Sequence, residues 1–186
     1  GDNLFYGQGL EGILLKASKL QNSSIFAYKV KDPRSYGVVK FDKKLKVISV
    51  HEKPKKFISS YAIPGIYIYD KSVSSHAKKL KKSNRGELEI TDLNKIYLKK
   101  KKLNVKILSR GIAWLDAGSP EQLLEASEYV RVIEKRQGLK IACLEEISFR
   151  NKWISKKELL INISKLPNCD YKDYLKSILN WIVKSI

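Results

Sequence analysis

Gly1-Asp2-Asn3-Leu4-Phe5-Tyr6, at the start of the chain, is the stretch that decides the fold. An Asp between Gly and Asn, next to the apolar run Leu4-Phe5-Tyr6, is typical of the end of a buried strand leaving a sheet. Open α/β sheets bind ligands at the carboxyl ends of their strands, and a carboxylate there is suited to a cation or a phosphate-bound metal. We therefore expect the chain to begin inside an active site, with the segment that precedes the site missing.

Outward from this stretch, hydrophobic periodicity predicts mixed strands and helices up to about Ser119 and helices alone after it. This change is the one boundary we draw, and it separates residues 1–118 from residues 119–186. Expected strands are 25–30, 36–41, 45–51, 61–69, 104–109 and 112–115, with a hairpin turn at 42–44 and a bulge or close backbone approach at Pro64-Gly65. Expected helices are 9–20, 72–82, 91–101, 120–137, 155–165 and 170–184, with Thr91, Ser119, Ser155 and Asp170 as N-caps and Gly138 after a C-terminus.

The net charge of +18 is compatible with nucleic-acid binding. However, the lysine runs 78–82 and 99–102 fall at the ends of predicted helices, where cations are favourable and solvated. No aromatic residues alternate with them as stacking platforms, so we favour neither nucleic acid nor a membrane as partner. Cys143 and Cys169 are too few for a disulfide framework or a zinc site, and a cytoplasmic location is expected.

Four clusters could carry chemistry: Asp2, the run 51–54, the run 83–92 and the run 113–118. Each alone could be a turn or a solvated strand end. Together they place two Asp, one Lys and one Arg at strand ends or in the loops that follow. Two carboxylates can hold Mg²⁺, while Lys and Arg neutralise phosphate. This set is typical of phosphoryl or nucleotidyl transfer, and with two His in the chain a histidine metal site is not expected.

Several motifs occur in the order of a known family. They are GDNLFYG at 1–7, DPRSYGVV at 32–39, EKP at 52–54, the strand 61–70, RGELEITD at 85–92, WLDAG at 114–118, IEKRQGLK at 133–140 and CLEEISFR at 143–150. In this order they resemble the bacterial glucose-1-phosphate thymidylyltransferases, sugar nucleotidylyltransferases of dTDP-rhamnose synthesis. The resemblance implies an α/β fold: the C-terminal portion of a Rossmann-like nucleotidyltransferase sheet, mixed and with a β-hairpin, followed by a helical region.

The resemblance also implies an activity and a set of residue roles. In the family, the phosphate oxygen of glucose 1-phosphate attacks the α-phosphorus of dTTP in line, and pyrophosphate leaves. The implied roles are Mg²⁺ ligation by Asp2 and Asp116, catalysis by Lys53 and Arg85, and substrate binding by Tyr36, Gly37, Glu52, Lys53, Ile63, Tyr67, Arg85 and Trp114. A regulatory nucleotide-sugar site would use Tyr6, Gly7, Arg110, Glu146, Ile147 and Arg150, and the full-length family protein is expected to be a homotetramer.

The chain also departs from the family pattern. Leu45 stands where the family usually has Gly, and it would be strained if the position requires a positive φ. His51, Pro64 and Ala117 replace common residues without touching a charged group of the site. Nothing here resembles the family's G-G-x-G-T-R-L loop, which binds the triphosphate, so we expect this chain to lack base recognition. An inactive remnant of the enzyme, or a basic nucleic-acid-binding protein, are the alternative functions.

Overall fold

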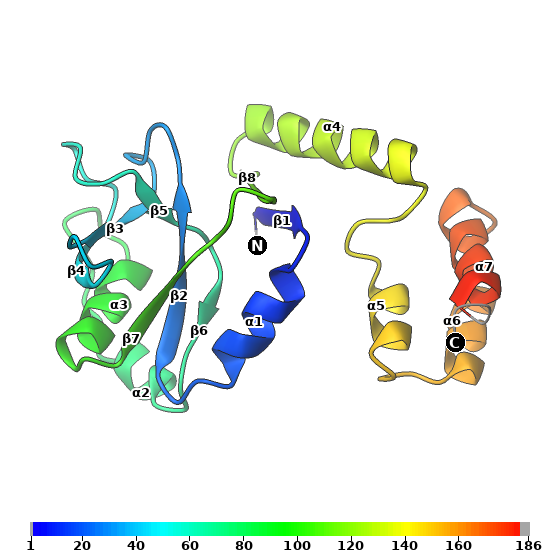
Figure 1. Ribbon diagram of the computed structural model, residues 1–186, viewed down its shortest axis with the longest axis horizontal. Coiled ribbons are helices and arrows are strands. Elements are labelled where there is room, and N and C mark those ends of the chain that lie inside the picture. The colour runs from blue at the N-terminus through cyan, green and yellow to red at the C-terminus, as the bar shows by residue number, and fades with distance from the viewer. Residues whose placement is uncertain (1, 183–186) are drawn as a thin grey trace. The chain divides into compact units, whose positions relative to one another are not determined.

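The structure, a computed structural model, describes residues 2–182. The chain forms two compact units, residues 1–123 and residues 124–186. Figure 1 labels the elements. The first unit is an α/β structure with a mixed sheet, and the second is helical, which agrees with the predicted fold class.

The sheet of the first unit is organised around β2 (Ser23–Lys29), which pairs with strands on both sides. It runs parallel to β7 (Leu103–Ile107) and antiparallel to β5 (Tyr61–Ile63) and β6 (Tyr67–Ile68). β5 pairs on its other side with β3 (Gly37–Phe41), and β3 pairs in turn with β4 (Val47–His51). Both faces of β2 are covered, which explains why Ser23 to Ala27 are all buried.

The predicted strand 61–69 is two strands rather than one. β5 pairs with the end of β2 and β6 with its beginning, and Pro64-Gly65 separates them. Pro64 cannot donate a ladder hydrogen bond. Gly65 approaches another segment closely, since a Cβ built on it would lie 3.0 Å from the Asn3 side chain. The close backbone approach predicted at this dipeptide is therefore confirmed.

Helices cover both faces of this sheet (Figure 1). α1 (Leu10–Ser18) packs on Phe26, Leu108 and Ile112, whereas α3 (Ile90–Lys99) packs on the opposite face, where Ile25 and Ala27 are buried. α2 (Val73–Ala77) is shorter than the predicted 72–82, because closely spaced lysines repel one another beyond it. Thr91 is not an N-cap. Helix α3 begins one residue earlier, and Thr91 is buried in its first turn.

The predicted hairpin is present, with β3 and β4 joined by a turn at Asp42. One carboxyl oxygen of Asp42 accepts hydrogen bonds from the backbone N–H groups of Lys44 and Lys46, each at 2.8 Å. Leu45, between them, has a φ of 60°. The departure from glycine at this position therefore places a branched side chain in the left-handed region, as predicted.

Leu45→Gly is expected to stabilise the first unit by about 0.5–1 kcal/mol. The substitution relieves a left-handed leucine that costs about 1–2 kcal/mol, and the greater freedom of glycine in the unfolded chain offsets part of this gain. Little packing is lost, because Leu45 is 62% exposed. The measurement is the free energy of unfolding in urea. Lys44→Gly is the matched control. The φ of Lys44 is not positive, so glycine there relieves no strain and should destabilise the hairpin.

A separate two-stranded ribbon pairs the first residues of the chain with a strand near the C-terminal end of the first unit. β1 (Asn3–Gly7) pairs antiparallel with β8 (Ile112–Asp116), with Asn3 opposite Asp116 and Gly7 opposite Ile112. Asp2 is exposed and directly precedes β1, whose residues are half-buried. The antiparallel pairing places Asp2 beside the carboxyl end of β8.

The second unit is built from α4 (Pro120–Gln137, which begins in the first unit), α5 (Leu144–Arg150), α6 (Lys156–Lys165) and α7 (Asp170–Ile182). Ser119 accepts a hydrogen bond from Gln122 N–H, and Ser155 forms a full capping box with Glu158. Gly138 follows α4 with a φ of 68°. These predicted caps are confirmed. Asp170 is the first residue of α7 and not its cap, and the predicted end of that helix at 184 lies outside the described residues.

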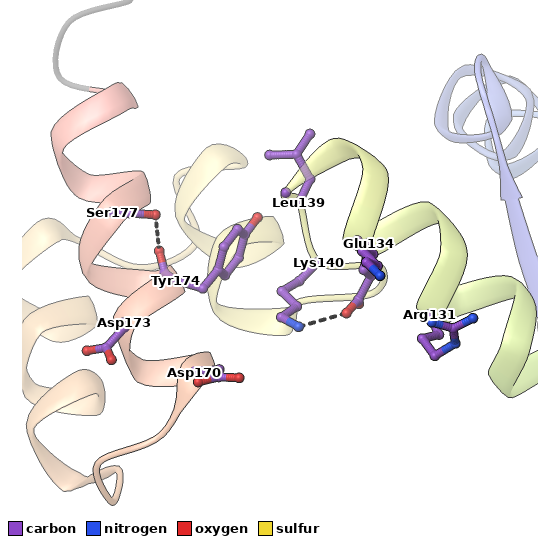
Figure 2. A pocket seen from close by; sticks show the side chains of 10 residues that line it. Arg131, Glu134, Leu139, Lys140, Asp170, Asp173, Tyr174 and Ser177 are labelled. Carbon is purple, nitrogen blue, oxygen red and sulfur yellow. Dashed lines mark hydrogen bonds and ion pairs between the residues drawn. The ribbon is translucent and has the colours of Figure 1, made fainter.

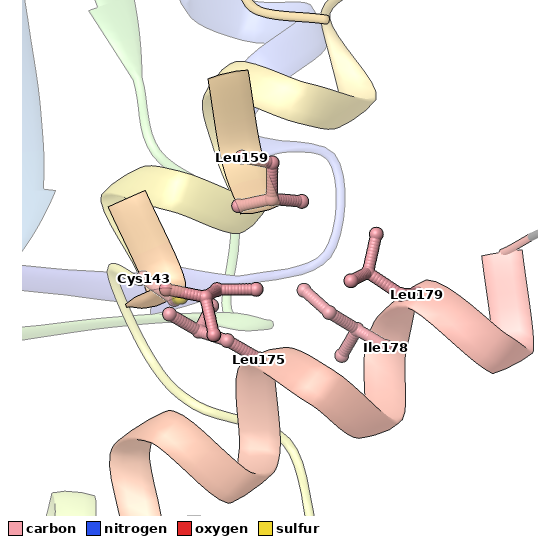
Figure 3. Packing of buried hydrophobic residues seen from close by; sticks show 6 residues of the cluster. Cys143, Leu159, Leu175, Ile178 and Leu179 are labelled. Carbon is pink, nitrogen blue, oxygen red and sulfur yellow. The ribbon is translucent and has the colours of Figure 1, made fainter. Parts of the chain in front are cut away.

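A small apolar core holds α5, α6 and α7 together. Figure 3 shows its members, and α7 supplies three of the buried side chains. They are Cys143, Leu159, Ile163, Leu175, Ile178 and Leu179. Two tyrosines of α7 reinforce this packing by donating their hydroxyl groups to α5, Tyr171 to Glu145 and Tyr174 to Glu146. The pairing of α5 with α7 is thus both apolar and polar.

The second unit is expected to lose stability at alkaline pH through Tyr174. Burial, and then the hydrogen bond to Glu146, raise the pKa of Tyr174 to about 12. The unfolded pKa is near 10, so the stabilisation is complete below pH 10 and is lost as the pH rises through 12. Tyr174→Phe should cost about 1 kcal/mol at pH 8. Between pH 10 and pH 12 only the wild type loses the contribution of Tyr174, so the difference in stability should shrink and then reverse its sign. Urea titrations of both proteins at the two pH values test this, and a constant difference would contradict it.

Candidate functional site

The candidate site begins with a pair of carboxylates at the end of the β1–β8 ribbon. The backbone N–H of Ala117 donates to the Asp2 carbonyl at 2.6 Å. One carboxyl oxygen of Asp2 and one of Asp116 each lie 3.5 Å from the position that a Cβ on Gly118 would take. Desolvation, and then the charge of Asp2, raise the pKa of Asp116. The two side chains are therefore close enough to repel each other.

This pair suits a hard divalent cation, because a cation between two carboxylates removes their repulsion. Residues 2–182 contain no group of three or more His, Cys, Asp or Glu side chains arranged to hold a metal ion. Mg²⁺ commonly binds through one or two carboxylates and completes its coordination with water and substrate phosphate. The donor set thus fits a Mg²⁺ ion that is shared with a phosphate-bearing ligand.

Asn3 connects this pair to the rest of the site, a role that sequence reasoning missed. Its side-chain oxygen accepts hydrogen bonds from Trp114 Nε1 at 2.6 Å and from Gly65 N–H at 3.1 Å. Its amide donates to Asp2 Oδ1 at 2.9 Å. Asn3 therefore orients one carboxylate and fixes the break between β5 and β6. The one feature of the sequence that could have indicated this role of Asn3 is its position next to Asp2 at the start of a strand.

Lys53 follows β4, within electrostatic range of Asp116. Its charge acts on Asp116, where it opposes the upward pKa shift. Its backbone has a φ of 34°, and its N–H donates to the Tyr36 carbonyl at 3.1 Å. Left-handed backbone at a non-glycine residue costs roughly 1–3 kcal/mol, and such residues cluster at functional sites. The turn that strains Lys53 therefore also links it to the segment around Tyr36.

Glu52 lies at the centre of a second group of residues. One oxygen accepts a hydrogen bond from the Thr91 hydroxyl, and the other lies 3.7 Å from Arg85 Nη1. A Cβ on Gly37 would lie 3.5 Å from Glu52 and 3.6 Å from Ile63 Cβ, so a side chain at position 37 would fill this space. Sequence reasoning missed the contact from Thr91 to Glu52, because it assigned the Thr91 hydroxyl to capping of the helix.

Aromatic rings border the same group. The rings of Tyr36 and Trp114 have centroids 4.9 Å apart, and Tyr28 contacts Trp114 edge-on at 5.6 Å. Tyr67 lies near Glu52. Burial, and then the Glu52 charge, raise the pKa of Tyr67 to about 12, so its hydroxyl stays protonated at neutral pH and can donate a hydrogen bond.

Arg85 projects from a loop that begins at Ser83, and it faces three carboxylates. Nη1 lies 3.6 Å from Glu89 and 3.7 Å from Glu52, while Nη2 donates to Glu87 at 3.1 Å. Gly86, next in the loop, has a φ of 79°. All the residues predicted to handle substrate or metal therefore gather in the first unit.

The residues expected to form a regulatory site fall into two groups, one in each unit. In the first unit, the β1–β8 pairing places Tyr6 and Gly7 opposite Ala113 and Ile112, close to Arg110 in sequence. In the second unit, Arg150 Nε donates to the buried Glu146 at 2.7 Å across one turn of α5, and Ile147 is 39% exposed. Within each unit the expected residues therefore lie together.

The second unit also contains a pocket of ≈ 580 Å³ (Figure 2). Its lining combines basic and acidic side chains from α4, the loop after it and α7: Arg131, Glu134, Lys135, Gly138, Leu139, Lys140, Asp170, Asp173, Tyr174 and Ser177. Lys140 is paired with Glu134 at 2.7 Å. Tyr174 joins the pocket to Glu146, to which its hydroxyl donates. Sequence reasoning did not indicate this pocket, because its lining comes from segments far apart in the chain.

Comparison with known proteins identifies the class to which this fold and site correspond. The chain belongs to the nucleotidyl transferase family, whose model matches residues 1–132. Curated relatives are glucose-1-phosphate thymidylyltransferases. The protein of Mycolicibacterium smegmatis is 47% identical over 97% of this chain and 62% of its own length, and that of Neisseria gonorrhoeae is 46% identical over 94% and 61%. The chain thus spans about three fifths of these relatives.

Solved structures agree with this assignment. A Bacillus anthracis protein assigned as a glucose-1-phosphate thymidylyltransferase, crystallised with a sucrose, is 38% identical, with a TM-score of 0.60 over 70% of this chain and 52% of that one. A UDP-glucose pyrophosphorylase in complex with UDP-glucose is 23% identical, with a TM-score of 0.60, and supports the fold alone. Among residues 2–182, no helix is both long and apolar enough to span a bilayer.

Proposed function

We propose that the chain carries the sugar-phosphate and metal side of a glucose-1-phosphate thymidylyltransferase. In this reaction, dTTP and glucose 1-phosphate form dTDP-glucose and pyrophosphate. The observation that supports this most strongly is the pair of carboxylates, Asp2 and Asp116, at one end of a ribbon, with the charge of Lys53 acting on Asp116. Glu52 and Arg85 lie together beside the same turn. The similarity to curated thymidylyltransferases supports the choice of nucleotide and sugar.

The proposed roles follow from the charges. Glu52 would accept hydrogen bonds from sugar hydroxyls, with its carboxylate oriented by Thr91. Arg85 and Lys53 would hold the sugar phosphate for in-line attack on the α-phosphorus. Asp2 and Asp116 would hold Mg²⁺, which when bound neutralises phosphate charge. Catalysis of this kind depends mainly on positioning and charge stabilisation. The side chains of Lys53 and Arg85 are each expected to contribute about 2–4 kcal/mol to transition-state stabilisation.

The resemblance to the family also supports three further elements of the proposal. We propose that the protein works in the cytoplasm, in dTDP-rhamnose synthesis, and that it assembles as a homotetramer. The two groups of residues around Arg110 and Glu146 would then serve regulation by a nucleotide sugar.

Calorimetric titration of the chain with α-D-glucose 1-phosphate in the presence of Mg²⁺ tests the proposed function. Binding is expected, and it should weaken at least tenfold in Arg85→Ala, because loss of a charge-assisted contact costs more than about 1.4 kcal/mol. Arg34→Ala is the matched control, since Arg34 is an exposed cation paired with Asp32. Absence of binding by the wild type, or equal binding of glucose without phosphate, would contradict the proposal.

A further inference from the structure

Glu89 is a buried charge in an otherwise exposed loop. Its side chain is 8% exposed, whereas that of Glu87, two residues earlier, is 62% exposed. A carboxylate removed from water is stable only when it is paired and hydrogen-bonded. Glu89 has both kinds of partner: the Ser83 hydroxyl donates to Oε1 at 2.8 Å, and Arg85 Nη1 lies 3.6 Å from the same oxygen.

The loop itself holds Glu89 and Arg85 in register. Ser83 N–H donates to the Glu87 carbonyl at 2.8 Å, and Gly86 N–H donates to the Ser83 carbonyl at 2.9 Å. The Ser83 hydroxyl accepts from Arg85 N–H at 3.1 Å while it donates to Glu89. Backbone and side chain of one serine therefore connect both partners of the ion pair.

The guanidinium of Arg85 is shared between two carboxylates of low exposure. Nη1 is nearly equidistant from Glu89 Oε1, at 3.6 Å, and Glu52 Oε1, at 3.7 Å. A guanidinium is a rigid planar fork that binds a carboxylate most strongly with two parallel hydrogen bonds. Without Glu89, Arg85 would lose this fixed intermediate position and move between solvent and Glu52, the carboxylate that the sugar needs.

We propose that Glu89 is a positioning residue, which draws Arg85 away from Glu52 and presents it to the sugar phosphate. This inference rests on the proposed function of the same site. Glu87 contacts the same guanidinium and carries the same charge as Glu89, but its side chain is exposed to solvent. Substitutions at the two glutamates remove the same charge, so a difference between their effects reports the positioning of Arg85 by the buried Glu89.

The first test is calorimetric titration with α-D-glucose 1-phosphate. Glu89→Gln should weaken binding about tenfold. Glu87→Gln should leave it within about twofold of the wild type or tighten it, because a negative charge near the phosphate is removed. Wild-type affinity in Glu89→Gln, or the same change in both variants, would overturn the proposal.

The second test needs no ligand and separates this inference from the proposed function. In NMR spectra, the Arg85 Nε–H signal should become mobile in Glu89→Gln, with a reduced heteronuclear NOE, and stay ordered in Glu87→Gln. A rigid Arg85 in Glu89→Gln would overturn the inference even if the wild type binds the sugar phosphate. If the wild type fails to bind but Arg85 is released in Glu89→Gln, the proposed function falls and the positioning contact stands.

Ser83→Ala keeps the charge of Glu89 and removes the hydrogen bond from the Ser83 hydroxyl to its carboxylate, so it serves if Glu89→Gln does not fold. It should release Arg85 partly, and its effect should not add to that of Glu89→Gln, because both act through one network. An Arg85 signal in Ser83→Ala as ordered as in the wild type would contradict this network.

Discussion

Asp116→Asn is expected to lower the affinity of the chain for divalent cations by on the order of 100-fold. Loss even of a residue that only supports a metal ligand costs 10- to 100-fold in affinity, and Asp116 would be one of two protein ligands. The affinity should also fall as the pH is lowered, because the raised pKa of Asp116 lets protons compete with the cation. Titration with Mn²⁺, followed by the EPR signal of the free ion, measures both effects.

Asp32→Asn is the control for this prediction. Asp32 is an exposed carboxylate of the same unit, paired with Arg34 at 2.7 Å. Its replacement should leave Mn²⁺ affinity unchanged. An equal loss of Mn²⁺ affinity in the two variants would mean that binding depends on the net charge of the protein and not on the carboxylate pair. If the wild type binds no Mn²⁺, the proposed metal role of Asp2 and Asp116 is contradicted.

Gly7→Ala is expected to destabilise the first unit by about 3 kcal/mol. A Cβ at this position would lie 2.4 Å from the Gly111 carbonyl oxygen and 2.7 Å from Ile112 Cα. Both are backbone atoms of the paired segment, so they cannot move aside as a flexible side chain could, and overpacking of this kind costs about 1–3 kcal/mol or more. The ribbon would separate or shift its register, and the carboxylate pair would separate with it.

Gly12→Ala provides the comparison. Gly12 lies within α1, and nothing stands within 4 Å of the Cβ that would be added. Because alanine is favoured over glycine inside helices by about 1 kcal/mol, this variant should be more stable than the wild type. Urea unfolding of both variants is the measurement. Similar stabilities for the two would show that the approach of Gly7 to Gly111 is not tight in solution.

The sequence was sufficient to predict features that depend on local chemistry. The hairpin around Asp42, the capping box of Ser155 and the glycine after α4 follow from residue types at fixed spacings, and all are present. The strain at Leu45 could also be anticipated. Such features need no knowledge of distant segments of the chain.

Features that depend on distant contacts were predicted poorly. Asp2 lies beside Asp116 because Asn3 pairs with Asp116, a contact between residues far apart in the sequence. Thr91 has the side chain of an N-cap, yet its hydroxyl is taken up by Glu52, far away in sequence. Glu89 gave no signal, because its burial comes from the fold of the loop around Ser83. In each case a tertiary contact overrides a local preference.

The antiparallel β1–β8 ribbon also has a consequence for folding kinetics. Asn3 and Asp116 stand at opposite ends of the first unit in sequence, and they pair directly. Closing so long a loop carries a high entropic cost, and contacts of large sequence separation form slowly. We therefore expect the ribbon to close after the hairpin and the helices have formed. In a stopped-flow refolding experiment, the ability to bind Mn²⁺ should recover later than helical ellipticity, so the cation would report the last step of folding.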